Sequence, residues 1–274
     1  MILAMNIGNT SFVVAIRKGE NLNVRRCLTA KIQSKLDFIN VINRFIGEFG
    51  VKTTDFTGAV ICSVSPGLTD FLHDVVKDLL GVSPLIVDSY MDMKLDLSNY
   101  DTKLIGSDRI AVCEAAISKY SLPAIVFDFG TATTINVIDE NNRYLGGSIM
   151  SGLMTGINSL AKNTAQLPAV DLEENVNLIG RNTKDCLTSG AIFGNAAMFD
   201  GMVLRIEKEI KRKTNVIVTG GYAGFVLPFC NCEHVFDKEL LVYGLFELYD
   251  YKTQHCTLTK NNITNLNPLM STTR

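Results

Sequence analysis

Two stretches of the chain carry the same order of apolar and polar positions. ILAMNIGNTSFVVAI (2–16) recurs as AIVFDFGTATTINVI (124–138): an apolar run, a polar Asn or Asp, a glycine among small polar residues, and a second β-branched run. A polar turn and another short extended segment follow each copy, so each copy predicts a β-hairpin. The repeat aligns Asn6 with Asp128 and indicates two related halves.

The rest of each half alternates further strands with helices. An apolar strand runs into a Gly/Ser turn at 58–68 (GAVICSVSPGL) and again at 215–225 (NVIVTGGYAGF). Apolar residues at helical spacing predict helices at 36–46, 71–79, 109–120, 152–162 and 188–213. The pattern predicts an α/β protein of two duplicated halves, each with a mixed sheet and flanking helices.

The half boundary is predicted after residue 121, near a Ser-Leu-Pro sequence. This gives an N-terminal half of 1–121 and a C-terminal half of 122–251. The remaining 252–274 is rich in Thr and Asn and lacks periodicity, so it is predicted to be a polar tail.

Composition narrows the function classes. The chain has 274 residues, 47% hydrophobic and 20% charged, which allows one large domain or two smaller cores. With 26 Lys+Arg against 28 Asp+Glu the net charge is -2, so no global positive field attracts nucleic acid or an anionic membrane. No apolar run approaches the roughly 20 residues that span a bilayer, and the polar Asn6 and Gly8 come too early for a signal peptide. With seven scattered cysteines read as reduced thiols, we expect a cytoplasmic protein that binds neither nucleic acid nor membrane.

The glycine turns of the repeat offer phosphate-binding chemistry. In NIGNT (6–10), glycine lets the backbone approach a ligand beside polar side chains and exposed N–H groups. The second copy, DFGTATT (128–134), adds a carboxylate and three hydroxyls. Each turn alone is typical of any hairpin. Two such turns, with a third at TGG (219–221), predict a site for adjacent phosphates of one nucleotide.

This layout resembles the actin, sugar kinase and Hsp70-type ATPase superfamily, whose two ribonuclease-H-like halves hold ATP between paired D-x-G-T turns. Further motifs follow in order: GSDR (106–109), DFGTATT, GGSIMSGL with LAKNTAQLP, GRNT (180–183) and VTGGYA. Over about residues 1–250 this series resembles the type III pantothenate kinases. The resemblance implies an actin-like ATPase fold and transfer of the ATP γ-phosphoryl group to pantothenate, the first step towards coenzyme A.

The resemblance also implies roles on the substrate side. Asp108 matches the catalytic aspartate, which orients the pantothenate hydroxyl and accepts its proton; alone, it would be the N-cap of the next helix. Arg109 suits the pantothenate carboxylate or the phosphates, and its alternative is a surface ion pair. Thr183 reaches, in the family, from the second half or a partner subunit; alone, it would also be an N-cap. The implied substrate-binding set is Tyr100, Gly106, Ser107, Asp108, Arg109 and Thr183.

On the nucleotide side, the resemblance implies ATP, Mg²⁺ and a monovalent cation. The implied nucleotide contacts are Asn6, Ile7, Gly8, Asn9, Thr10, Ser11, Phe12, Val13 and Thr131. ATP phosphates supply most ligands of the Mg²⁺ ion. Asp128 is the implied ligand of K⁺ or NH₄⁺, and the apolar helix 191–206 is the implied surface of a homodimer.

Two positions depart from the family pattern. Asn6 replaces the aspartate of the first phosphate turn and removes one charge near the Mg²⁺, although an amide still accepts a hydrogen bond from a metal-bound water. This predicts an active but metal-demanding kinase, or one with poor ATP affinity. It also keeps open a catalytically weak or inactive member that acts as a ligand-binding regulatory protein. Lys103 replaces a usual proline and predicts a more mobile loop before GSDR.

Other groups of residues give weaker functional signals. Cys230, Cys232 and His234 have a spacing that would put three ligand-type side chains on one face of a strand, and His255-Cys256 would complete a zinc site. That spacing is not a usual zinc knuckle, so metal binding is disfavoured. His73 is expected at the surface. A kinase of the same superfamily with another acceptor is a third alternative, which GSDR and GRNT disfavour.

Overall fold

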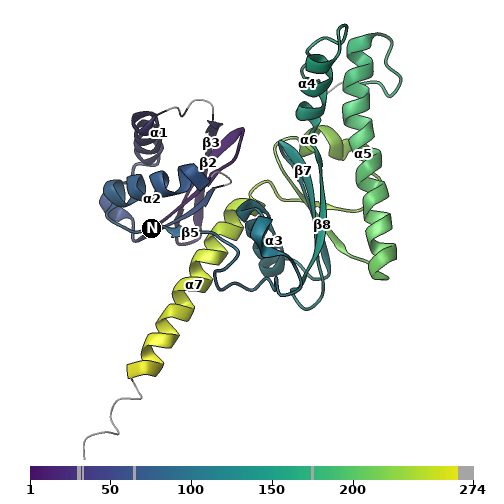
Figure 1. Ribbon diagram of the computed structural model, residues 1–274. Helices are drawn as coiled ribbons and strands as arrows, with labels where there is room; N and C mark the ends of the chain where they lie inside the picture. Colours follow the sequence, from purple (N-terminus) through teal and green to yellow (C-terminus); the bar gives the residue numbers. More distant parts are fainter. Residues whose placement is uncertain (30–31, 33, 64–65, 174–175, 265–274) are drawn as a thin grey trace, which may run out of the picture. The chain divides into compact units, whose positions relative to one another are not determined.

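The computed structural model describes residues 1–264 except 30, 31, 33, 64, 65, 174 and 175 (Figure 1). These residues form two compact units. The first contains Met1–Lys94, Thr102–Glu114 and the chain from Val242, and the second contains Leu95–Asp101 and Ala115–Leu241. The last helix therefore belongs to the first unit.

The first unit is built on a five-stranded mixed sheet. Its strands are β1 (Ile2–Ile7), β2 (Ser11–Lys18), β3 (Asn21–Leu28), β4 (Gly58–Ser63) and β5 (Leu85–Ile86), in the order β3-β2-β1-β4-β5. β1 runs antiparallel to β2 and parallel to β4. The first predicted hairpin and the strand at 58 are confirmed; residues 64 and 65 of the predicted turn lie outside the described residues.

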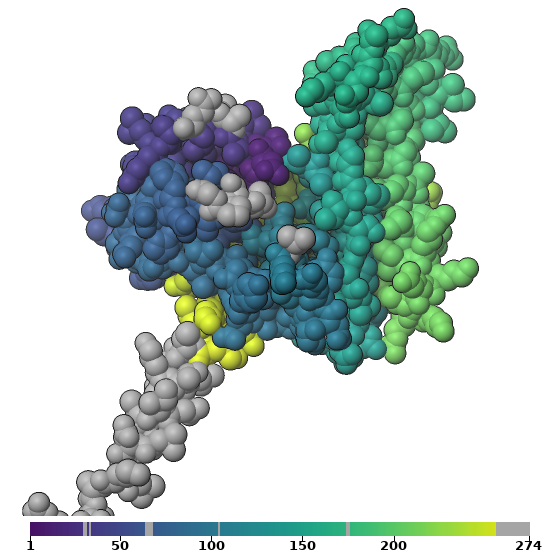
Figure 2. All heavy atoms as spheres, in the orientation of Figure 1, coloured from purple at the N-terminus to yellow at the C-terminus, as the bar shows by residue number. Residues whose placement is uncertain are grey.

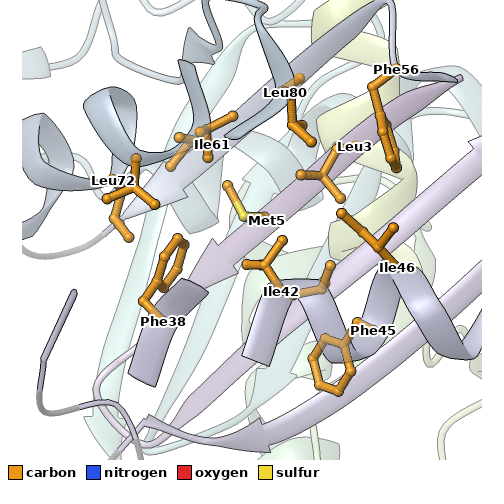
Figure 3. Close-up of a cluster of buried hydrophobic side chains, with 14 of the residues drawn as sticks. Leu3, Met5, Phe38, Ile42, Phe45, Ile46, Phe56, Ile61, Leu72 and Leu80 are labelled. Atoms are coloured by element: carbon orange, nitrogen blue, oxygen red, sulfur yellow. The ribbon is translucent and has the colours of Figure 1, made fainter. Parts of the chain in front are cut away.

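Helices α1 (Lys35–Glu48) and α2 (Pro66–Leu80) bury one face of this sheet. Leu3, Met5 and Ile7 alternate along β1 and join that core, and Figure 3 shows Met5 towards Phe38 and Leu3 towards Leu80. A short 3₁₀ turn (Thr53–Asp55) leads into β4. Because side chains alternate along a strand, Asn6 points to the opposite face of the sheet.

Helix α7 (Leu240–Thr264) completes the first unit. A Cβ at Gly244 would overlap the backbone of Ala111, so glycine allows α7 to approach α3 (Ser107–Lys119) closely. Arg17 of β2 forms a two-pronged ion pair with Asp250 of α7, at 2.6 and 2.7 Å. The helix continues through 252–264, so the prediction of a tail without regular structure is wrong for those residues.

The second unit repeats the strand order of the first. Its strands are β6 (Ala124–Phe129), β7 (Ala132–Ile138), β8 (Tyr144–Ser151), β9 (Asn215–Thr219) and β10 (Val235–Phe236), in the order β10-β9-β6-β7-β8. β6 runs antiparallel to β7 and parallel to β9, as β1 does to β2 and β4. Each unit thus has an antiparallel three-stranded meander extended by parallel strands, which confirms the predicted duplication.

Helices α4 (Leu153–Asn163), α5 (Thr183–Ile210) and α6 (Ala223–Val226) pack in the second unit, with a 3₁₀ turn at Leu227–Phe229. Phe199 of α5 packs on Phe127 of β6, with ring centroids 4.6 Å apart. The apolar face of 191–206, implied as dimer surface, is therefore covered by its own sheet. The space-filling view shows other parts of α5, in green, at the surface (Figure 2). No helix in the described part of the chain is long and apolar enough to cross a membrane.

Candidate active site

In the first unit, candidate residues gather where parallel strands β1 and β4 end. Asn6 pairs in register with Cys62, and Ile7 pairs with Ser63. Neighbours in register share a face of the sheet, so Asn6 and Cys62 point to the same side. Ser107, the first residue of α3, contacts this edge: its Oγ accepts from Cys62 Sγ at 3.2 Å and donates to the Ser63 carbonyl at 3.2 Å. The fold thus brings the first phosphate turn and the GSDR motif to one strand edge.

Asp108 lies in the first turn of α3. The helix begins at Ser107, and the Gly106 carbonyl accepts the N–H of Ile110 at 3.2 Å, so the alternative of Asp108 as the N-cap is wrong. Its Oδ1 accepts the N–H of Arg109 at 2.8 Å, and a Cβ at Gly106 would overlap this oxygen. Glycine before the helix therefore leaves room for the carboxylate, and the helix N-terminus favours its negative charge.

Two neighbours of Asp108 are buried. Arg109 is only 7% exposed, so the alternative of a surface ion pair is wrong. Cys62 is fully buried, and burial, with the negative charge of Asp108, raises the pKa of its thiol well above the ordinary value. Cys62 is therefore a neutral thiol at physiological pH. Lys103 lies in a 3₁₀ turn (Thr102–Leu104) just before this motif.

The first phosphate turn divides into exposed and buried residues. The Gly8 N–H donates to the Ser11 carbonyl at 2.9 Å, and the Thr29 hydroxyl donates to the Gly8 carbonyl at 2.8 Å. Asn9, Thr10 and Ser11 are exposed at the tip. Three further nucleotide candidates, Ile7, Phe12 and Val13, have side chains that are buried in the sheet. Only their backbone groups are left to contact a ligand.

Asn6 presents an unsatisfied acceptor. The residue is 7% exposed, and within the described part of the chain its Oδ1 has no hydrogen-bond partner. A buried acceptor without a donor costs roughly 1–3 kcal/mol. A metal-bound water is a suitable donor, so this atom fits the outer coordination sphere of an ATP-bound Mg²⁺ ion.

In the second unit, the turn between β6 and β7 is enclosed by glycines. Asp128 pairs in register with Thr134 of β7 and Thr219 of β9. A Cβ at Gly220, where φ is +102°, would lie 2.5 Å from Asp128 Oδ1 and would overlap the Phe129 nitrogen. A Cβ at Gly152 would overlap the carbonyls of Gly130 and Thr131. The half-buried Asp128 carboxylate thus borders a cradle that a side chain would fill, which suits a large, weakly hydrated cation.

Two further substrate candidates lie elsewhere on the second unit. Tyr100 packs edge-on against Tyr144, with ring centroids 4.8 Å apart at 85°. The buried Tyr144 donates its hydroxyl proton to Asn136 Oδ1 at 3.0 Å, a support that the local sequence pattern did not reveal. Thr183 is the exposed first residue of α5; Asn182 is the N-cap and accepts the Asp185 N–H at 3.0 Å, so Thr183 is not the cap.

Cys230, Cys232 and His234 do not lie on a strand, in contrast to the arrangement considered for a zinc site. Residues 230–234 precede β10 and are not a strand, so the proposed shared strand face is wrong. Cys230 Sγ contacts the Val226 carbonyl and Cys232 Sγ the Asp200 carbonyl. The side chain of Cys256 lies outside the described residues. His73 lies at the surface between Asp74 and Ser83, as predicted.

Solved structures identify the class of this architecture. The activator of 2-hydroxyisocaproyl-CoA dehydratase from Clostridium difficile, with bound ADPNP, matches with a TM-score of 0.53 and 13% identity over 95% of this chain and 97% of that one. At this identity the likeness concerns the fold alone, and the two mixed five-stranded sheets with helices have the actin-like ATPase fold.

Sequence comparison then gives the family. The family model for type III pantothenate kinase matches residues 2–205. The type III pantothenate kinase of Moorella thermoacetica is 34% identical over 254 residues, which are 92% of this chain and all of that protein. The enzyme of that name from Thermomicrobium roseum is 34% identical over 251 residues, 91% of this chain and 97% of that one. The chain belongs to the type III pantothenate kinase family.

Proposed function

We propose that this chain transfers the γ-phosphoryl group of ATP to the primary hydroxyl of pantothenate, giving 4′-phosphopantothenate. Family membership over nearly the whole chain supports this reaction. The structural observation that carries it is the position of Asp108, at the start of α3 in the unit that also holds the first phosphate turn. In the cytoplasm, its proposed location, both substrates would be available.

Asp108 acts on the acceptor hydroxyl. The Arg109 N–H donates to its Oδ1, which orients this oxygen. The hydroxyl oxygen forms the new bond to the γ-phosphorus as the bond to the β–γ bridging oxygen breaks, and the proton passes to Asp108 late in the transfer. The buried Arg109 guanidinium pairs with the pantothenate carboxylate or the phosphates, and the hydroxyls of Tyr100 and Thr183 contact pantothenate.

The nucleotide is held by backbone groups and bound cations. Gly8, Asn9 and Thr10 offer N–H groups and side chains at the first turn, and Thr131 does so at the second. Asn6 Oδ1 accepts a hydrogen bond from a water of the ATP-bound Mg²⁺. Asp128 holds K⁺ or NH₄⁺. When bound, these cations offset the charge of the transferring phosphoryl group.

A homodimer is part of the proposal. Leu178 and Ile179, just before the GRNT motif, are 65% and 81% exposed, so both side chains are accessible to another chain. This places apolar surface beside Thr183, the residue expected to reach a neighbouring subunit. If the Ile179→Lys variant is monomeric in light scattering, the result supports the proposed homodimer. A wild-type protein that is monomeric and fully active would contradict it.

The test is a coupled ATP-turnover assay with and without pantothenate, across Mg²⁺ and K⁺ concentrations. ADP release that depends on pantothenate supports the kinase. Saturable pantothenate binding in calorimetry without turnover supports instead the ligand-binding regulatory protein that Asn6 keeps open. If turnover occurs with another alcohol and not with pantothenate, the proposed acceptor is wrong.

A further inference from the structure

A chain of two hydrogen bonds joins the end of β4 to the start of α3. The Cys62 thiol donates to Ser107 Oγ at 3.2 Å, and the Ser107 hydroxyl donates to the Ser63 carbonyl at 3.2 Å. Cys62 is fully buried and Ser107 is 8% exposed. The three residues belong to the first unit, and the next residue along the chain is Asp108.

The direction of these bonds is fixed by their chemistry. Ser107 has one hydroxyl proton and gives it to the Ser63 carbonyl, so its oxygen needs a donor from elsewhere. A protonated thiol supplies that donor, and a thiolate would not. Burial and the charge of Asp108 raise the pKa of the Cys62 thiol, so it stays protonated over the working pH range of the protein.

We propose that Cys62 is a positioning residue for the proposed kinase: its thiol holds Ser107, and thereby holds the first turn of α3 with Asp108 and Arg109, against the end of strand β4. This inference rests on the proposed function, because Asp108 must be placed relative to the acceptor hydroxyl. The Ser107 hydroxyl is buried and already has a hydrogen bond on each side. In this proposal Ser107 therefore places the start of α3, and its side chain does not contact the substrate.

The position of the first turn matters more than the strength of one bond. Misplacement of a reacting group by about 1 Å costs on the order of 100-fold in rate. Removing the Cys62 sulfur leaves Ser107 Oγ without its donor and leaves a space beneath the turn. The turn then has freedom to shift, whereas the phosphate turn at Gly8 keeps its own hydrogen bonds to Ser11 and Thr29.

The experiment compares Cys62→Ala, Cys62→Ser and a control, Cys113→Ala. Cys113 is also a fully buried thiol and lies on α3 itself, and in the described part of the chain it has no hydrogen bond to Ser107, so its removal leaves the bonds from Cys62 and to Ser63 in place. For Cys62→Ala we expect kcat/KM for pantothenate to fall roughly 10- to 100-fold, with KM for ATP unchanged. Cys62→Ser keeps a donor and should recover most of the loss, and Cys113→Ala should keep the wild-type kcat/KM.

Hydrogen exchange gives a second readout that needs no turnover. The amides of Arg109 and Ile110 bond to the Gly106 carbonyl, and we expect them to exchange faster in Cys62→Ala than in Cys113→Ala. Equal exchange and unchanged kinetics in both alanine variants would overturn the proposal and leave Cys62 a residue of packing only. If Cys62→Ala does not fold, Cys62→Ser and Ser107→Ala provide the same comparison. A wild-type protein without pantothenate-dependent turnover would refute the proposed function, and exchange would still decide the role of Cys62.

Discussion

The two units share one strand order but differ at the turn where their central hairpins close. In the first unit the turn follows a neutral Asn6, and a Cβ at Gly8 would meet only Ser11, at 3.3 Å or beyond. In the second unit the turn follows the carboxylate of Asp128 and is tightly enclosed by Gly152 and Gly220. The turn glycines themselves are alike, because a Cβ at Gly130 would meet its nearest atoms at 3.4 Å. The second unit differs in its carboxylate and in the close approach of Gly152 and Gly220 to the turn.

The largest expected effect concerns Asp108, the carboxylate in the first turn of α3 in the first unit. Asp108→Asn should lower kcat by at least roughly 100-fold, because the amide cannot accept the hydroxyl proton. ATP binding, measured by calorimetry, should persist. Asp70→Asn, an exposed carboxylate on α2, is the matched control and should retain full turnover. Comparable loss in both variants would contradict the role of Asp108.

The enclosed turn of the second unit should respond strongly to one added methyl group. Gly220→Ala combines a positive φ with overlap at Phe129 and Asp128, so we expect the free energy of unfolding to fall by about 3 kcal/mol or more. Gly146→Ala has a similar φ, +114°, and a Cβ there would meet no atom of another described residue within 4 Å, so it isolates the backbone strain, on the order of 1–3 kcal/mol. Chemical denaturation measures both.

The open turn of the first unit should be far more tolerant. Gly8→Ala should cost less than about 1 kcal/mol, because φ is not positive there and the nearest atom lies at 3.3 Å. If Gly8→Ala destabilises the protein as much as Gly220→Ala, then the contrast between an open and a closed turn is wrong.

The charge difference between the two turns can be removed directly. Asn6→Asp gives the first turn the carboxylate of the second, and we expect the Mg²⁺ concentration for half-maximal turnover to fall several-fold, because a charged acceptor binds a metal-bound water more strongly. A Mg²⁺ titration at saturating ATP measures the shift. Unchanged metal dependence would show that the Asn6 side chain does not face the metal.

The smallest expected effect lies in the support of Tyr100 on the second unit. Tyr144→Phe keeps the ring contact and removes the bond to Asn136, worth about 1 kcal/mol. KM for pantothenate should rise about five-fold with kcat unchanged. Tyr90→Phe, at an exposed tyrosine, should change neither constant. A fall in kcat alone would assign Tyr144 a different role.

The sequence predicted features that depend on local period and turn chemistry. Both hairpins followed from apolar runs with a glycine turn, and their repetition predicted two related halves. The shared strand order comes from the structure. Residues 252–264 were missed because apolar periodicity signals a packed helix face, and this stretch has none. The nucleotide-binding motif predicted ligand contacts for Ile7, Phe12 and Val13, whereas their side chains are buried because both faces of the sheet are covered there.

Other site features could not be predicted because they depend on pairing between distant segments. Cys62 reaches Ser107 across 45 residues of sequence only through the parallel register of β1 and β4 and the packing of α3. Tyr144 reaches Tyr100 through a backbone bond between Tyr144 and Asp96. Neither position carries a local signal, because a thiol or a phenol in an apolar segment usually fills the core.

The ion pair between Arg17 and Asp250 has a consequence for synthesis on the ribosome. The second unit is nearly continuous in sequence and is complete once Leu241 has emerged, whereas the first unit begins at Met1 and needs α7. Until α7 has been synthesised, the strands of the first unit lack the helix that pairs with Arg17. The unit that contains the first strands of this sequence is therefore the unit whose parts are all present last.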